Sequence, residues 1–88
     1  MRYELMLPHQ IRQAIEDNVP VVLPLGVLEY HGEHLPVGMD TLAVTRIIDH
    51  LEPDLPMVIM PAFYYGAASY AVAGPEGKGS LHVDAETI

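Results

Sequence analysis

The sequence predicts an α/β fold built around one strand–helix–strand unit whose two strands are parallel. Two short apolar runs, residues 19–25 and 55–60, lack the polar alternation of a strand with one face in water. Such runs are typical of strands buried on both faces. Between them, residues 42–51 place apolar side chains at helical spacing. A strand, a loop, a helix and a second strand in this order form a right-handed crossover.

A shorter helix is expected ahead of the first strand. Pro8 suits its first turn, because the first N–H groups of a helix have no partner within it. Ile11, Ala14 and Ile15 then recur at the spacing of one buried helical face. The pattern ends at residues 16–18, where we expect the helix to stop.

The first strand candidate contains two prolines. Pro20 and Pro24 lack the N–H group that a sheet ladder requires. We therefore expect this strand at a sheet edge or with irregular ends. The long helix that follows is expected to be capped by Asp40 or Thr41 and to run to about His50.

The chain beyond the second strand is harder to interpret. Three aromatic residues at 63–65 leave this strand at the same edge as the first loop, where they either wall a pocket or pack into the core. Residues 67–80 are rich in small residues and glycine and are expected to form a surface or lid loop. Residues 81–88 resemble the start of another helix, with Asp84 as its cap.

Composition limits the classes of partner. Twelve acidic and four basic residues give a net charge of −8, which disfavours nucleic acid and anionic membranes but favours metal cations. The absence of cysteine excludes disulfides and thiolate ligands. No run approaches the roughly 18 apolar residues of a membrane span, and the N-terminus lacks a signal-peptide pattern. We expect a cytoplasmic protein whose residues 1–88 form one small domain, with apolar surface left for a partner.

The loop between the first strand and the long helix carries the candidate chemistry. Glu29 and His31 are two residues apart, so in extended backbone both side chains point to the same side. Asp40, at the helix start, can close on them. One imidazole and two carboxylates suit zinc, manganese or iron, and a carboxylate can bridge two ions. The alternative is a solvated turn, in which His34 is an ordinary loop histidine and not a partner of a ligand or the substrate.

Residues 24–40 resemble the signature of the creatininase (creatinine amidohydrolase) family, P-x-G-x-x-E-x-H-G-x-H-L-P-x-x-x-D. The resemblance continues weakly through Tyr65-Gly66 and Gly79-Ser80-Leu81. It implies an α/β/α layered fold with a mainly parallel sheet, of which this chain would be the N-terminal βαβ portion. It also implies hydrolysis of C–N bonds in cyclic or linear amides, at a centre of two ions, by enzymes that are usually oligomers. Glu29 would bind one ion, His31 the other, and Asp40 would bridge them, while His34 and Tyr65 would bond to a ligand or to the small-molecule substrate.

Departures from the family pattern affect the expected substrate and activity. Met39 stands where the family usually has threonine, and residues 67–72 replace a Glu-His pair. This segment is similar to a branch of 3-dehydro-scyllo-inosose hydrolases, which open a ring in inositol catabolism. The family's remaining histidine and glutamate ligands lie beyond residue 88, and His82 and Glu86 do not match their spacing. We therefore expect little activity from this chain alone, and three hypotheses stay open: part of a hydrolase, a metal-binding subunit completed by another chain, or a non-catalytic fragment.

Overall fold

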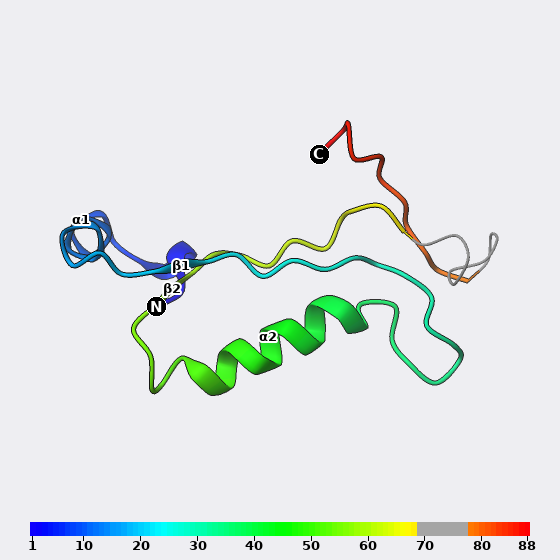
Figure 1. The fold of residues 1–88 in the computed structure, drawn as a ribbon, viewed down its shortest axis with the longest axis horizontal. Coiled ribbons are helices and arrows are strands. Elements are labelled where there is room, and N and C mark those ends of the chain that lie inside the picture. Colours follow the sequence, from blue (N-terminus) through cyan, green and yellow to red (C-terminus); the bar gives the residue numbers. More distant parts are fainter. Residues whose placement is uncertain (69–77) are drawn as a thin grey trace.

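The computed structural model describes residues 1–68 and 78–88 of the 88-residue chain (Figure 1). Its helices and strands occur in the following order: η1 (Tyr3–Leu5), α1 (Pro8–Glu16), β1 (Val21–Val22), α2 (Met39–Leu51) and β2 (Val58–Ile59). β1 and β2 are parallel, with Val21 opposite Val58 and Val22 opposite Ile59. The predicted strand–helix–strand unit is therefore confirmed, with α2 as the crossover helix.

Both strands are shorter than the apolar runs that predicted them, and the prolines explain why. The carbonyls of Pro20 and Pro24 accept hydrogen bonds from the N–H groups of Val58 and Phe63, at 2.8 and 2.9 Å. Pro20 and Pro24 themselves have no N–H group to donate in return, so one hydrogen bond of the parallel ladder is missing at each proline. The two chain segments nevertheless continue side by side beyond the strands (Figure 1), and pair again where Leu25 lies opposite Phe63.

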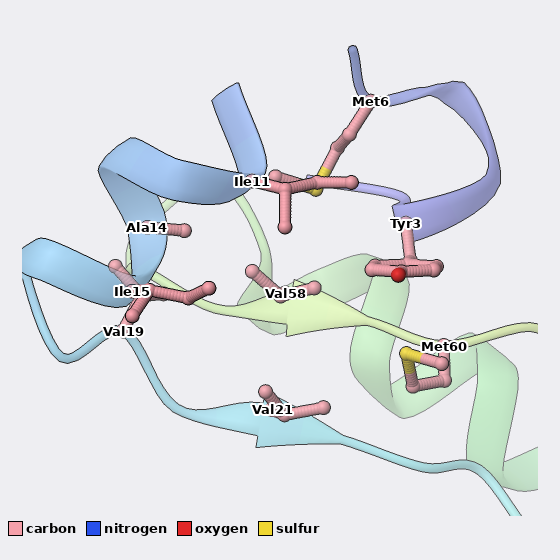
Figure 2. Close-up of a pocket in the computed structure, with 9 residues that line it drawn as sticks. All are labelled: Tyr3, Met6, Ile11, Ala14, Ile15, Val19, Val21, Val58 and Met60. Carbon is pink, nitrogen blue, oxygen red and sulfur yellow. The ribbon is translucent and has the colours of Figure 1, made fainter. Parts of the chain in front are cut away.

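Opposite faces of the strands pack against different helices. Ile59 is completely buried and packs with Ile48 of α2 and with Met57, while Val22 and Val44 border this cluster. The other face lies toward α1 and η1, where an apolar pocket of about 240 Å³ remains (Figure 2). Its lining consists of Tyr3, Met6, Ile11, Ala14, Ile15, Val19, Val21, Val58 and Met60. The sheet thus lies between α2 on one face and α1 on the other, although α1 covers only one end of its face of the sheet (Figure 1).

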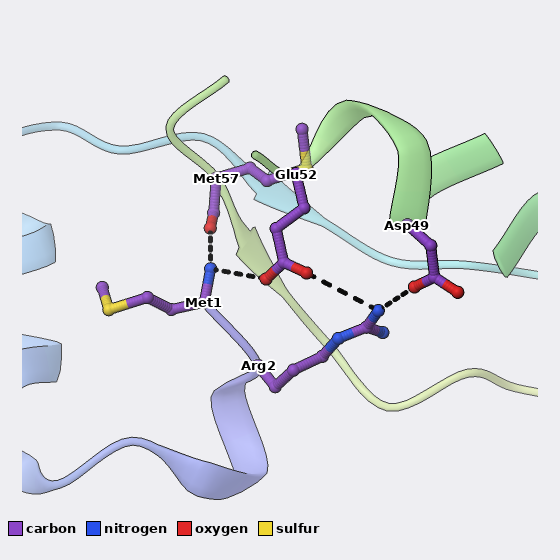
Figure 3. Close-up of polar contacts among 5 residues, drawn as sticks. All are labelled: Met1, Arg2, Asp49, Glu52 and Met57. Atoms are coloured by element: carbon purple, nitrogen blue, oxygen red, sulfur yellow. Dashed lines mark hydrogen bonds and ion pairs between the residues drawn. The ribbon is translucent and has the colours of Figure 1, made fainter. Parts of the chain in front are cut away.

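The N-terminal residues lie along the second edge of β2. Ile59 donates its N–H to the carbonyl of Met1 at 2.8 Å, and Arg2 lies opposite Ile59 in a parallel bridge. The ammonium group of Met1 donates to the Met57 carbonyl at 2.6 Å and pairs with Glu52 at 3.2 Å (Figure 3). Arg2 pairs with Asp49 and, at 3.7 Å, with Glu52. β2 therefore lies between the N-terminal segment and β1, whereas among the described residues β1 has β2 as its one neighbour.

The chain is extended for its size. Its radius of gyration is 16.0 Å, against about 12 Å for a compact domain of this length. Its accessible surface is 6270 Å², against about 5,100 Å² for a compact monomer of this mass. Val21, Leu23 and Leu25 are 65%, 54% and 56% exposed along β1 and its continuation. Much apolar surface is therefore uncovered. Separately, no helix of the described residues is long and apolar enough to cross a membrane.

Two predictions about helix ends were wrong. α2 begins at Met39 with Gly38 as its cap, and no side chain bonds the cap, so Asp40 lies inside the first turn instead of capping it. Residues 81–88 form a single turn, closed by a 2.9 Å hydrogen bond from Thr87 N–H to the Asp84 carbonyl, and no helix. Of the expected surface loop at 67–80, residues 69–77 lie outside the described part of the chain.

Candidate metal centre

The loop between β1 and α2 folds back on itself at the end of the sheet. The N–H of Glu29 donates to the carbonyl of Val37 at 2.8 Å, which brings the start of α2 next to the first half of the loop. A turn at Pro36–Met39, closed by a 3.1 Å hydrogen bond, then leads directly into the helix. Asp40 follows in the first helical turn, where the helix dipole favours a negative charge.

Three side chains meet at this fold. Nε2 of His31 lies 3.4 Å from Oε1 of Glu29 and 3.1 Å from Oδ2 of Asp40. One donor atom from each residue falls within 4.8 Å of the other two. Ligands about 2.0–2.2 Å from one tetrahedral ion are separated by roughly 3.3 Å. The donor set and its spacing therefore fit a divalent cation.

Burial strengthens this interpretation for one of the acids. Glu29 is 8% exposed, and His31 and Asp40 are partly buried. A carboxylate removed from water requires compensation from hydrogen bonds or an opposite charge. Two carboxylates around one imidazole leave an excess of negative charge when the imidazole is neutral. A divalent cation suits a cluster of this charge and donor type.

Tyr30 lies between the two ligand candidates in sequence and has a distinct environment. Partial burial, then the charge and hydrogen bond of the Glu33 carboxylate, raise the pKa of the Tyr30 phenol above 10.0. The Nζ atom of Lys78 lies 5.0 Å from the centre of the Tyr30 ring, a distance suitable for a cation–π contact. The phenol is therefore neutral at physiological pH.

His34 and Tyr65 lie apart from the three-residue cluster. His34 is exposed, and its ring folds over Gly32, where a Cβ atom would lie 2.9 Å from the imidazole. The φ angle of Gly32 is +98°, which also requires glycine. Tyr65 is 52% exposed and packs edge-to-face on Phe63, with ring centroids 6.0 Å apart. The predicted roles of His34 and Tyr65 at the site stay predictions.

Sequence reasoning missed the contact that sets the position of α2. A Cβ atom on Gly26 would lie 1.9 Å from Oγ1 of Thr41 and 2.6 Å from its backbone nitrogen. Thr41 is completely buried, and its hydroxyl has no hydrogen-bond partner among the described residues. Position 26, on the segment that continues β1, must therefore be glycine if the first turn of α2 is to pack there. A glycine directly after the apolar run 19–25 was the available signal of such a close approach.

Known proteins resemble the chain over most of its length. The family model of creatininase, described as creatinine amidohydrolase, matches residues 4–88. A 3-dehydro-scyllo-inosose hydrolase of Thermotoga maritima is 28% identical over 75 residues, which cover 85% of this chain and 24% of that protein. A creatinine amidohydrolase of Pseudomonas putida is 32% identical over 82 residues, which cover 91% and 31%.

A solved structure agrees with the architecture. A mutant creatininase superposes with a TM-score of 0.82 at 20% identity, covering 98% of this chain and 35% of the other. At this identity the likeness concerns the fold. The chain spans about a quarter to a third of the length of the relatives and the solved structure that it matches.

Proposed function

Because the chain belongs to the creatininase family, we propose that it forms part of a metal-dependent hydrolase acting on C–N bonds of small cyclic or linear amides. The observation that carries the proposal is the convergence of Glu29, His31 and Asp40, whose donor atoms lie within 4.8 Å of one another. The spacing of these residues in the sequence is that of the family signature. The proposed domain is residues 1–88, as one partial domain.

The proposed ions are zinc or manganese, with iron as a further candidate. Glu29, His31 and Asp40 would hold them. A bound divalent ion would polarise the substrate carbonyl and lower the pKa of water. Asp40 directs Oδ2 toward His31, and its second carboxylate oxygen would contact a second ion. The 3.4 Å distance between Glu29 Oε1 and His31 Nε2 also allows both residues to bind one ion. The number of bound ions is therefore measured together with the metal content.

A second candidate function concerns the substrate. Similarity to a 3-dehydro-scyllo-inosose hydrolase favours ring opening of a cyclic ketone instead of an amide. The segment in which this distinction was predicted, residues 67–72, lies largely outside the described part of the chain. Hydrolysis of a cyclic amide and of an inosose-type ketone, compared on the same metal-loaded protein, distinguishes the two.

The proposed site needs further ligands, which a homo-oligomer or a complementary chain would supply. Three ligands are few for two ions, and the chain spans only part of its relatives. Its accessible surface exceeds that of a compact monomer by about 1,200 Å². A standard interface buries about 800 Å² from each partner, so the uncovered surface is sufficient for one. The alternative is a non-catalytic metal-binding subunit. If the protein kept its activity and its bound metal on dilution, that result would argue against a site completed by another chain and against a non-catalytic subunit.

Metal content measures the proposed site directly. The full chain is loaded with Zn²⁺ or Mn²⁺, dialysed against metal-free buffer and analysed for bound metal. Asp40→Ala is expected to lose more metal than Glu29→Ala or His31→Ala, because a bridging ligand serves both ions. His9→Ala, which removes an exposed imidazole on α1, is the control and should retain all of it. Unchanged metal content in all three site variants would refute the assignment.

A further inference from the structure

A second segment of the chain supports the loop that carries the candidate ligands. Leu81 donates its N–H to the carbonyl of Leu28 at 2.9 Å, and Val83 donates to the carbonyl of Gly66 at 2.9 Å. Residues 80–83 therefore lie between the metal-site loop and the segment that follows β2. Gly79, at a φ of +90°, lies against Val37 on the returning half of the same loop.

The contact nearest to the ligands comes from a side chain. Tyr30 donates its backbone N–H to Oγ of Ser80 at 2.9 Å, in partly buried surroundings. Tyr30 is the residue between Glu29 and His31. Its peptide orientation determines whether those two side chains point to the same side, because alternate side chains share a side only in extended backbone.

We propose that Ser80 is a positioning residue of the metal centre, acting through the Tyr30 amide. Its hydroxyl holds the backbone between Glu29 and His31 in the conformation that brings their donor atoms to 3.4 Å. The inference rests on the proposed function, since it assigns Ser80 a role in ligand geometry. In this role Ser80 would act on the ligand geometry and would contact neither the substrate nor an ion.

His82 reinforces this segment. Its Nδ1 accepts the backbone N–H of Ala68 at 3.0 Å, and its Nε2 donates to Asp84 at 2.8 Å. Both ring nitrogens are thus engaged in holding residues 80–84 against the chain after β2. This leaves the serine hydroxyl at a fixed position opposite the loop, at little cost in additional side-chain entropy.

Metal affinity and amide exchange together test the proposal. Co²⁺ is titrated into the full chain and into Ser80→Ala, Ser80→Thr and Thr45→Ala, with affinity and the visible spectrum recorded. Ser80→Ala should bind Co²⁺ about tenfold more weakly, as outer partners of metal ligands typically do, with an altered spectrum. Ser80→Thr retains the hydroxyl and should restore both. Thr45→Ala removes a hydroxyl that bonds the Leu42 carbonyl at 2.9 Å on α2, and should change neither.

Hydrogen exchange of metal-free protein provides the second readout. The Tyr30 amide should exchange about two- to tenfold faster in Ser80→Ala, as expected for loss of one hydrogen bond. The Met60 amide, bonded to the Val22 carbonyl of β1 at 2.8 Å, reports global stability and should be unchanged. If Ser80→Ala bound Co²⁺ as tightly as the unaltered chain, or if its Tyr30 amide exchanged at the same rate, the proposed role of Ser80 would be refuted and the proposed function would stand. Absence of Co²⁺ binding by the unaltered chain would overturn the proposed function and this inference together.

Discussion

Replacing Gly26 with alanine would test how the start of α2 is positioned next to the segment that continues β1. The new Cβ atom would lie 1.9 Å from Oγ1, 2.6 Å from the nitrogen and 2.7 Å from Cα of Thr41. Two of these three atoms belong to the backbone of the helix. A rotamer change of Thr41 therefore cannot relieve the overlap, and the first turn of α2 must move.

The size of the effect follows from these distances. Ordinary contacts of a Cβ atom begin near 3.4 Å, so the backbone of Thr41 has to retreat by about 0.8 Å, a shift of the kind that overpacked cores undergo at a cost of about 1–3 kcal/mol. For a domain of this size each kcal/mol lowers Tm by about 4–8 °C. The neighbouring Asp40 moves with the helix turn, so its 3.1 Å contact with His31 lengthens and metal affinity falls as well.

The assay compares thermal unfolding and Zn²⁺ binding of Gly26→Ala with those of Gly66→Ala. A Cβ atom on Gly66 would meet its nearest neighbour at 3.9 Å, an ordinary contact. Gly66→Ala should therefore be neutral or more stable by about 0.4–1 kcal/mol, through the unfolded chain. Adding Thr41→Ala to Gly26→Ala removes only the hydroxyl overlap and should recover part of the loss. Equal stability of the two glycine variants would refute the close approach of Gly26 and the first turn of α2.

Two further predictions concern the core and the loop. Ile59→Ala, at a completely buried position, should cost about 2–5 kcal/mol in denaturant unfolding, whereas Ile47→Ala, at a 60% exposed position, should stay within about 0.5 kcal/mol. Glu33→Gln should lower the pKa of the Tyr30 phenol toward 10.0, because it removes a charge and a hydrogen bond that raise it. A phenol whose pKa is higher in the folded than in the unfolded protein lowers the free energy of unfolding as pH rises above its unfolded pKa. Glu33→Gln should therefore lose less stability than the unaltered chain above pH 10, as measured by pH-dependent unfolding.

Local patterns in the sequence were sufficient to predict the order of elements. The apolar spacing of Ile11, Ala14 and Ile15 placed α1, and the apolar runs placed both strands of the parallel pair. Helix ends were less predictable. Asp40 has the chemistry of a cap, but the turn at Pro36–Met39 places the cap at Gly38, two residues earlier, because loop closure outweighs cap preference.

The residues of the candidate site also differ in how well local sequence patterns predict their contacts. Glu29 and His31 converge to 3.4 Å, as their spacing of two residues predicts for extended backbone. Asp40 joins them through the Glu29–Val37 hydrogen bond, which brings together two halves of one loop. Ser80 is fifty residues from Tyr30 in the sequence, and no local periodicity indicates such a contact. Long-range contacts of this kind depend on the packing of several segments at once.

Among residues 1–68 and 78–88, β1 has one neighbouring strand, and this has a consequence for the behaviour of the protein at high concentration. Proline commonly protects sheet edges from pairing with other molecules. Here the Pro20 and Pro24 carbonyls point toward the segment containing β2, and in a parallel strand the nitrogen of the same residue faces the same neighbour. Both prolines therefore interrupt the inner pairing, and within the described part of the chain they do not protect the outer edge of β1. Intermolecular strand addition and aggregation are opposed mainly by the net charge of −8. Salt screens that repulsion, and acidification toward the isoelectric point near 4.7 removes it.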